Sequence, residues 1–229
     1  MSLTGRRIAV TGAFGSLGAA VVQAALVAGA RVAAIDRADA PPAGIDPGQA
    51  ERFGGVDLAD TAQAQDVIDE AARTLGGLDA LVNIAGTFRF ETLADGSPDA
   101  WDFLYRINLR TAVAASKAAL AHLPDGGRII NIGAAAALKA GAGMGAYAAS
   151  KSGVMRLTES LAEELKPRGI TVNAVLPSII DTAPNRRDMP KADFDKWVKP
   201  SQLAEVIVFL LSDQASAITG ALIPVTGRV

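Results

Sequence analysis

The stretch Arg7-Ile-Ala-Val-Thr-Gly-Ala-Phe-Gly-Ser-Leu-Gly18 decides the fold of this chain. Arg7 to Thr11 is a short apolar run typical of a buried strand, and the alanine-rich segment from Leu17 to Ala28 predicts a helix that ends at Gly29. Three glycines form the turn between them. A strand, a glycine turn and a helix in this order predict a turn that holds the pyrophosphate of a dinucleotide.

The same alternation continues along the chain. We expect strands at 31–36, 78–85, 127–132, 170–176 and 221–225, helices at 61–75, 99–123, 145–166 and 201–211, and a loop at 38–55. Near-continuous apolar strands between helices indicate a parallel sheet covered on both faces. We therefore predict an α/β fold with a doubly wound, Rossmann-type sheet in three α/β/α layers, built from residues 1–229 as a single domain.

Composition excludes several classes of function. The formal net charge of -2 over 229 residues argues against nucleic acid or an anionic membrane as the main partner. The absence of cysteine excludes disulfides and thiolate metal sites. The only histidine, His122, is expected at the end of a helix or on the surface, which leaves no multi-histidine metal site. With no apolar run of about 20 residues and no signal peptide, we expect a soluble, cytoplasmic protein.

Asp36 predicts which coenzyme the turn receives. It ends the second expected strand, 18 residues after Gly18. A carboxylate there accepts hydrogen bonds from the ribose hydroxyls and repels a 2′-phosphate, which favours NAD(H). Arg37 leaves NADP(H) open, because a guanidinium can pair with a phosphate.

Tyr147-Ala-Ala-Ser-Lys151 supplies the candidate proton donor. A tyrosine and a lysine four residues apart lie on the same face of a helix. An ammonium close to a phenol lowers the pKa of the phenol toward the range of a general acid. Most pairs at this spacing are simply neighbours on a helix, so the glycine turn and the order of the motifs must support the interpretation.

Together these residues resemble the short-chain dehydrogenase/reductase family over nearly the whole chain. The matching pieces follow the family's order: Thr11 to Gly18, Asp57-Leu58, Asn83-Ile-Ala-Gly86, Asn108, Tyr147 with Lys151, and Pro177 to Thr182. The resemblance implies that Asp57 and Leu58 flank the adenine, and that Thr182 contacts the carboxamide. It also implies that Asn108 helps to carry a proton relay, and that Lys151 binds the nicotinamide ribose and lowers the pKa of Tyr147.

The expected catalytic residues are therefore Tyr147, Lys151 and Asn108. The expected coenzyme-binding residues are Gly12, Phe14, Gly15, Ser16, Leu17, Gly18, Asp36, Arg37, Asp57, Leu58, Asn83, Ala85, Gly86, Tyr147, Lys151, Pro177 and Thr182. No metal is expected.

The chain departs from the family at Ala134. The family's catalytic serine lies 13 residues before the tyrosine, where this sequence has Ala134. A methyl group cannot donate a hydrogen bond, and losing such a donor typically costs about 3–4 kcal/mol of transition-state stabilisation. An ordinary ketone should therefore be a poor substrate unless another donor replaces the serine. Ser150 and Ser178 are nearby, but neither stands at the family position.

Dihydropteridine reductases, a subgroup of the family, also have alanine here. The resemblance to them extends to Gly15–Gly18, to 134–144 and above all to the long segment Leu176–Trp197. It implies transfer of hydride from NADH to a quinonoid dihydropterin or another small conjugated acceptor, with Tyr147 as proton donor. Two alternatives remain: a general alcohol or ketone oxidoreductase with another substrate, and an NAD-binding sensor without turnover.

Two further expectations concern the surroundings of the site. The irregular stretch 178–200 contains Phe194 and Trp197 beside Arg186 and Arg187, and we expect it to form a lid over the substrate. The helices at 99–123 and 145–166 are alanine-rich and would leave apolar faces exposed on a monomer. We expect a homodimer or homotetramer through these two helices, which in the family pair across a two-fold axis.

Overall fold

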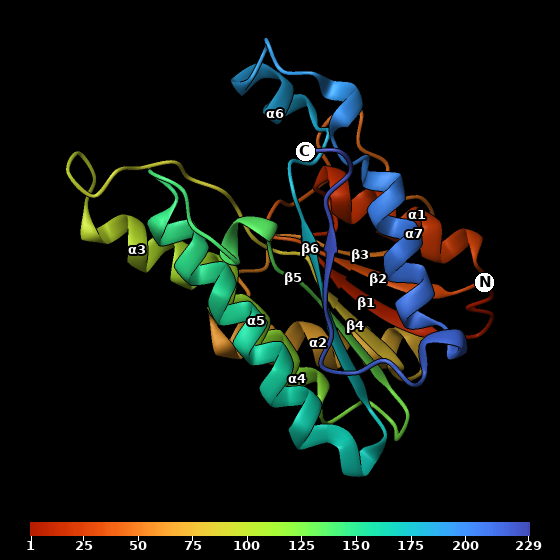
Figure 1. Cartoon of the computed structure of the whole chain (residues 1–229). Helices are drawn as coiled ribbons and strands as arrows, with labels where there is room; N and C mark the ends of the chain where they lie inside the picture. Colours follow the sequence, from red (N-terminus) through yellow and green to blue (C-terminus); the bar gives the residue numbers. More distant parts are fainter.

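A computed structural model describes all 229 residues and contains one seven-stranded parallel sheet (Figure 1). The strand order is β3-β2-β1-β4-β5-β6-β7. The strands are β1 (Arg7–Thr11), β2 (Arg31–Ile35), β3 (Glu51–Phe53), β4 (Ala80–Asn83), β5 (Arg128–Ile132), β6 (Thr171–Pro177) and β7 (Leu222–Val225). Because β1 lies between β2 and β4, the chain winds outward from the centre in both directions, which confirms the doubly wound fold.

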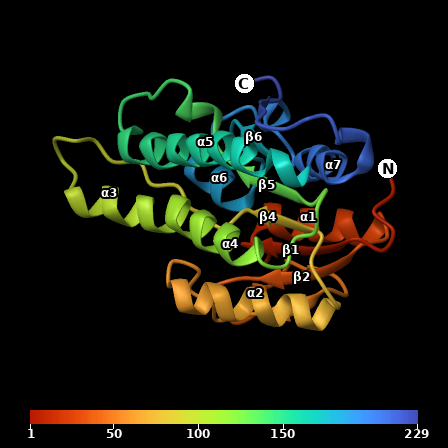
Figure 2. The same cartoon turned by 90° about the horizontal axis from the view of Figure 1, so that it is seen from below.

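Helices cover both faces of the sheet. They are α1 (Ser16–Val27), α2 (Thr61–Leu75), α3 (Pro98–Leu104), α4 (Thr111–Ala119), α5 (Gly145–Leu165), α6 (Ala183–Asp188) and α7 (Pro200–Leu211). Figures 1 and 2 show α1 and α7 on one face and α2, α4 and α5 on the other. None of the helices has the length and apolar character needed to cross a bilayer.

The strands are buried on both faces because successive side chains alternate between the two helix layers. In β1, Ile8 and Val10 join the core under α1 and α7, whereas Ala9 joins the core under α2, α4 and α5. All three side chains are fully buried. Each buried Ile or Val contributes about 1.5–3 kcal/mol, so the two cores hold the three layers together.

The structure corrects two expected elements. The expected loop 38–55 contains the short edge strand β3, which pairs with β2. The expected continuous helix 99–123 is instead α3, a six-residue π-helix (Tyr105–Arg110) and α4. The π-helix shifts the helix register by one residue at Asn108, and such insertions are frequent at functional sites.

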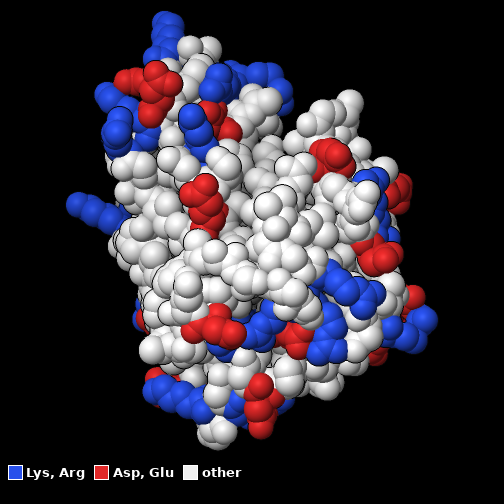
Figure 3. Space-filling model, turned by 90° about the vertical axis from the view of Figure 1, so that its right-hand side faces the viewer, with Lys and Arg blue, Asp and Glu red and all other residues white.

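Charged side chains do not form a single-sign field on the face seen in Figure 3. Acidic and basic groups are interspersed there, with many of the basic ones on the lobe at the upper left.

The carboxyl ends of β1 and β4 lie at the point where the winding reverses direction, and a crevice is expected there in folds of this type.

Candidate active site

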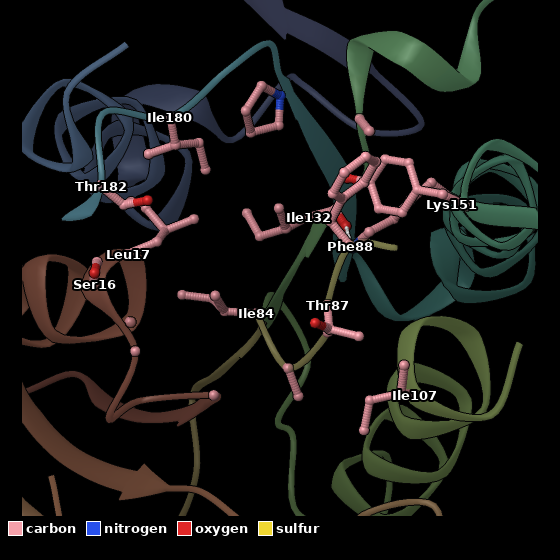
Figure 4. A pocket seen from close by; sticks show the side chains of 18 of the residues that line it. Ser16, Leu17, Ile84, Thr87, Phe88, Ile107, Ile132, Lys151, Ile180 and Thr182 are labelled. Atoms are coloured by element: carbon pink, nitrogen blue, oxygen red, sulfur yellow. Dashed lines mark hydrogen bonds between the residues drawn. The ribbon is translucent and has the colours of Figure 1, made fainter. Parts of the chain in front are cut away.

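A cleft of about 1340 Å³ opens at the carboxyl ends of the strands. In Figure 4, Ser16 and Leu17 of α1 face Phe88 and Lys151 across it, and Ile84 and Ile132 lie between them. Pockets for one small ligand usually measure about 300–1,000 Å³. The cleft therefore has room for a dinucleotide together with a substrate.

The three glycines of the turn serve different needs. Gly12 has a φ of 66°, and a Cβ there would lie 2.7 Å from the Ala85 nitrogen. A Cβ on Gly18 would collide with the Gly12 carbonyl. A Cβ on Gly15, in contrast, would meet no protein atom closer than the Gly12 oxygen at 3.5 Å. The protein itself does not require glycine at position 15, but a closely bound pyrophosphate would.

The N-terminus of α1 is free to receive that anion. Gly15 occupies the N-cap position, and no side chain caps the first turn. The unpaired N–H groups of a helix N-terminus attract phosphate oxygens. The residues of the turn therefore fit a dinucleotide.

Asp36 ties the turn to the next strand. One carboxylate oxygen accepts a hydrogen bond from the Phe14 nitrogen at 2.9 Å, and the other accepts from the Ala38 nitrogen at 3.0 Å. The Phe14 ring is buried in the core, so this residue reaches the cleft with its backbone. Arg37 is exposed at the same edge of the cleft.

Asp57 and Leu58 line the cleft together with Asp36. Asp57 also forms an ion pair of 2.7 Å with Arg106, which fixes the carboxylate. Ala85 and Gly86 line the cleft as well.

Asn83 does not line the cleft, contrary to expectation. Its amide nitrogen donates to Ser116 Oγ at 3.0 Å and to Asn131 Oδ1 at 2.9 Å, inside the layer between the sheet and the helices. Asn131 in turn donates to Thr158 Oγ1 at 2.9 Å. These buried polar groups join α4, β4, β5 and α5, so the geometry gives Asn83 a structural role.

Lys151 is buried, and its ammonium donates to the Ile132 carbonyl at 2.8 Å. Burial lowers the pKa of Lys151 to about 8. Tyr147 is half-buried one turn earlier, and burial raises its pKa to about 12. The expected lowering of the Tyr147 pKa by Lys151 is therefore wrong, because desolvation of the phenolate dominates.

Asn108 lies behind the cleft wall rather than on it. Its Oδ1 accepts from the Thr87 nitrogen at 2.7 Å, and its Nδ2 donates to Ser150 Oγ at 3.0 Å. A Cβ on Gly86 would lie 2.7 Å from Asn108 Oδ1 and 3.3 Å from Lys151 Nζ. The backbone at Gly86 thus runs close to both side chains, which leaves no room for a larger residue.

The wall at Ala134 presents methyl groups, because Ala134, Ala135 and Ala136 all line the cleft. The two hydroxyls considered as replacements for a serine are already engaged. Ser150 Oγ donates to the Tyr147 carbonyl at 2.7 Å, and Ser178 Oγ donates to the Thr226 carbonyl at 2.7 Å. Neither compensates for Ala134 in this arrangement.

The segment 178–200 is ordered by its own contacts, which corrects the expectation of an irregular loop. It contains α6, whose N-cap Thr182 accepts from the Asn185 nitrogen at 3.3 Å. Arg186 forms an ion pair with Asp181 at 2.6 Å and lies 4.6 Å from the centre of the Phe194 ring. Pro177 and Thr182 line the cleft, together with Ile179, Ile180, Asn185, Asp188 and Met189.

Gly227 and Arg228 contact this segment through their backbones. The Arg228 nitrogen donates to the Lys196 carbonyl at 3.0 Å. A Cβ on Gly227 would lie only 2.6 Å from the same carbonyl, so the two backbones are in close contact. Figure 1 shows the C-terminus beside this part of the fold.

Part of the cleft wall is aromatic, which the sequence motifs do not predict. Phe88 lies edge-on to Tyr147 with ring centres 5.0 Å apart, and Phe90 and Phe103 also line the cleft, with Met144 nearby. Two phenylalanines spaced by two after Gly86 were the available signal. His122, in contrast, pairs with Asp69 at 2.5 Å just beyond α4, at the end of the sheet opposite the cleft.

The chain is similar to known dehydrogenases and reductases over nearly its whole length. A family model described as enoyl-(acyl carrier protein) reductase matches residues 12–227. The chain is 36% identical over 241 residues to 2-(S)-hydroxypropyl-CoM dehydrogenase 3 of Xanthobacter autotrophicus, covering 96% of this chain and 94% of that protein. It is 35% identical to D-threitol dehydrogenase of Mycolicibacterium smegmatis, covering 98% of this chain and 93% of that protein. A crystal structure of a short chain dehydrogenase from Burkholderia cenocepacia in complex with NADP superposes with a TM-score of 0.87 and 33% identity, covering 99% of this chain and 98% of the other.

Proposed function

The chain belongs to the short-chain dehydrogenase/reductase family and is an NAD(P)-dependent oxidoreductase, and we propose that it reduces a small conjugated acceptor with NADH. The proposed acceptor class is the quinonoid dihydropterins and similarly electron-poor ring systems. Residues 1–229 act as one dinucleotide-binding unit, with the segment 178–200 over the substrate.

Ala134 carries this proposal. A ketone must be polarised by a hydrogen-bond donor as negative charge develops on its oxygen. The wall at Ala134 offers methyl groups, and the hydroxyls of Ser150 and Ser178 are engaged elsewhere. A quinonoid ring regains aromatic character when it is reduced, so it needs less polarisation. The flat apolar side chains of Phe88 and Phe103 suit such a ring.

Tyr147 is the proposed proton donor. Because its pKa is raised to about 12, the phenol is fully protonated at neutral pH, which is the form that a reduction requires. Lys151, with a pKa of about 8, carries a positive charge at neutral pH that stabilises the phenolate left behind. Both Asn108 and Lys151 lie against Gly86, which supports a relay that returns a proton to Tyr147. A bound nicotinamide coenzyme supplies the hydride.

NADH is the proposed coenzyme because Asp36 stands where the adenosine ribose would lie. Its carboxylate is held by the Phe14 and Ala38 nitrogens and would repel a 2′-phosphate. The Burkholderia structure holds NADP, and Arg37 would favour the same coenzyme here, so NADPH is the alternative.

A general alcohol or ketone oxidoreductase is the second candidate. The names of the Xanthobacter and Mycolicibacterium relatives, a hydroxypropyl-CoM dehydrogenase and a threitol dehydrogenase, favour it. Because position 134 is alanine, the carbonyl would in that case have to be polarised by a group other than a serine hydroxyl at this position.

One assay separates the two candidates. NADH oxidation is measured with quinonoid dihydropterin, a set of quinones and a set of simple ketones at equal concentrations. We expect the conjugated acceptors to react much faster than the ketones. Rapid turnover of ketones with no reaction of dihydropterin would refute the proposed substrate class and support the second candidate.

A homodimer or homotetramer through the 99–123 and 145–166 helices belongs to the same proposal. Trp101 on α3, Tyr105 on the π-helix and Val113 on α4 are 42%, 53% and 42% exposed. Apolar side chains exposed along one helical rod suit a contact with a second copy of the chain.

A further inference from the structure

Ser150 lies between Asn108 and Tyr147, two of the three proposed catalytic residues, and is hydrogen-bonded to both. It is 4% exposed on α5, and its hydroxyl donates to the carbonyl of Tyr147 three residues earlier at 2.7 Å. A serine in a helix often makes such a bond by itself. Here the same oxygen also accepts a hydrogen bond from Asn108 Nδ2 at 3.0 Å. One buried hydroxyl therefore joins α5 to the π-helix.

Asn108 extends the connection to a third segment. Its Oδ1 accepts from the Thr87 nitrogen at 2.7 Å, just after β4. The hydrogen bonds thus run from Thr87 through Asn108 and Ser150 to the Tyr147 carbonyl. Because Gly86 lies against Asn108 and Lys151, the segment has little freedom to shift.

Phe88 completes a closed ring of contacts, which consists of Thr87, Asn108, Ser150, Tyr147 and Phe88. Phe88 follows Thr87 directly, and its phenyl group meets the phenol group of Tyr147 with centroids 5.0 Å apart and planes at 85°. The segment after β4 therefore holds Tyr147 twice. It holds the backbone carbonyl through Asn108 and Ser150, and it holds the phenol ring through Phe88. The contact is directional because the charge distribution of aromatic groups favours this edge-to-face geometry. Such pairs are worth about 0.5–1.5 kcal/mol beyond their buried area.

We propose that Ser150 is a positioning residue for proton transfer, which fixes the Tyr147 ring against Phe88 through Asn108. This inference rests on the proposed role of Tyr147 as proton donor and does not depend on which acceptor is reduced. Loss of the hydroxyl leaves the Asn108 amide nitrogen without its partner in a buried place, and the ring of contacts opens. A small displacement of a reacting group is enough to lower the rate on the order of 10- to 100-fold.

The first test compares Ser150→Ala with Ser152→Ala and Ser150→Thr. Ser152 lies on the same helix and also donates to a backbone carbonyl, that of Ala137 at 3.1 Å, but it stands outside the ring of contacts. We expect Ser150→Ala to lower kcat at least about 10-fold, with the Kd for NADH unchanged within about 2-fold. Ser152→Ala should keep the wild-type kcat, and Ser150→Thr, which retains a hydroxyl, should recover most of it.

A double variant separates positioning from general damage. In a Tyr147→Phe background, Ser150→Ala should have almost no further effect on the residual rate, because the group that it positions is gone. An equal loss in both backgrounds would overturn the proposal, as would equal values of kcat for Ser150→Ala and Ser152→Ala.

A spectroscopic measurement decides the question without turnover. The chain has two tyrosines, so ¹³C-tyrosine labelling gives two ring signals, and Tyr105→Phe assigns them. The ring current of Phe88 displaces the signal of Tyr147. Ser150→Ala should move this signal toward that of free tyrosine, while Ser152→Ala leaves it in place. An unmoved signal would overturn the role of Ser150. If no acceptor reacted at all, the proposed function would fail, and this signal would still decide how Tyr147 is held.

Discussion

Lys151 and Tyr147 lie one helical turn apart on α5, and burial shifts both side chains toward their neutral forms. It lowers the pKa of Lys151 to about 8 and raises that of Tyr147 to about 12. The ammonium is bound to the Ile132 carbonyl rather than to the phenol. Tyr147 is therefore a protonated donor, and the neighbouring Lys151 is an ammonium whose charged form is disfavoured by burial. This affects the free energy of unfolding as well as the chemistry.

Lys151→Met should change how stability depends on pH. The folded pKa of about 8 lies below the ordinary 10.5, so the cost of burying the ammonium is fully present below pH 8. The unfolded chain binds more protons between pH 8 and 10.5, and the wild type therefore gains stability over this window, on the order of 3 kcal/mol. The raised pKa of Tyr147 acts in the opposite direction only above about pH 10. Urea unfolding at pH 7 and at pH 9.5 should show about 2 kcal/mol of this gain in the wild type and in the exposed control Lys139→Met, but not in Lys151→Met.

Tyr147→Phe should remove the proton donor and keep the coenzyme site. We expect kcat to fall by about 10²–10⁴-fold, with the Kd for NADH nearly unchanged. Tyr105→Phe, at the only other tyrosine, is the control and should behave as the wild type. A Tyr147→Phe variant with full activity would show that another group donates the proton.

Ala134→Ser should open the enzyme to ketones. A hydroxyl at this wall would polarise a carbonyl, and we expect kcat/KM for a simple ketone to rise by on the order of 10²-fold. The value for a conjugated acceptor should change little. Ala135→Ser places a hydroxyl on the same wall one residue away and is the matched control. If the ketone rate did not respond, the methyl group at Ala134 would not be what limits it.

Asp36→Asn should alter the choice of coenzyme while keeping the turn in place. The amide oxygen can still accept from the Phe14 nitrogen, whereas the hydrogen bond from the Ala38 nitrogen and the negative charge are both lost. We expect the ratio of kcat/KM for NADPH to that for NADH to rise about 10-fold or more, because repulsion of the 2′-phosphate disappears. Steady-state kinetics with both coenzymes measure this ratio. An unchanged ratio would assign the selection to another residue, with Arg37 the first to examine.

Val113→Arg should disrupt assembly if α4 contacts a second copy. Val113 is 42% exposed in the first turn of this helix, and a charge there would have to be buried at the contact. Light scattering coupled to gel filtration should then give a smaller mass than for the wild type. Val27→Arg, on the outer face of α1, is the control and should not change the mass. A wild-type chain that runs as a monomer would contradict the prediction directly.

The regular elements were predictable from sequence because burial leaves a periodic pattern. The expected helix 61–75 is confirmed at both ends, where Asp60 caps it and Gly76 terminates it in the left-handed conformation. The strand β3 was missed because Glu51–Phe53 has only three residues and lies next to a stretch rich in Pro and Gly. The π-helix was missed because one inserted residue leaves no trace in an apolar helical pattern.

The position of a residue in the cleft could be predicted from the sequence where the backbone geometry requires a particular residue. It was less predictable where it depends on the orientation of a side chain. Gly12 and Gly18 are required by close contacts, and nearly all the expected coenzyme residues line the cleft. Asn83 was placed in the correct segment, but its side chain points to Asn131 and Ser116 instead. The Tyr147 pKa was misjudged because sequence spacing contains no information on desolvation.

The contact of Arg228 and Gly227 with Lys196 lets residues outside the cleft wall influence it. The two backbones brace the segment 178–200, part of which lines the cleft. A side chain at position 227 would meet the Lys196 carbonyl and loosen that brace. A Gly227→Ala variant should therefore bind coenzyme normally and yet discriminate poorly among substrates, so substrate specificity can be altered without changing a residue of the cleft.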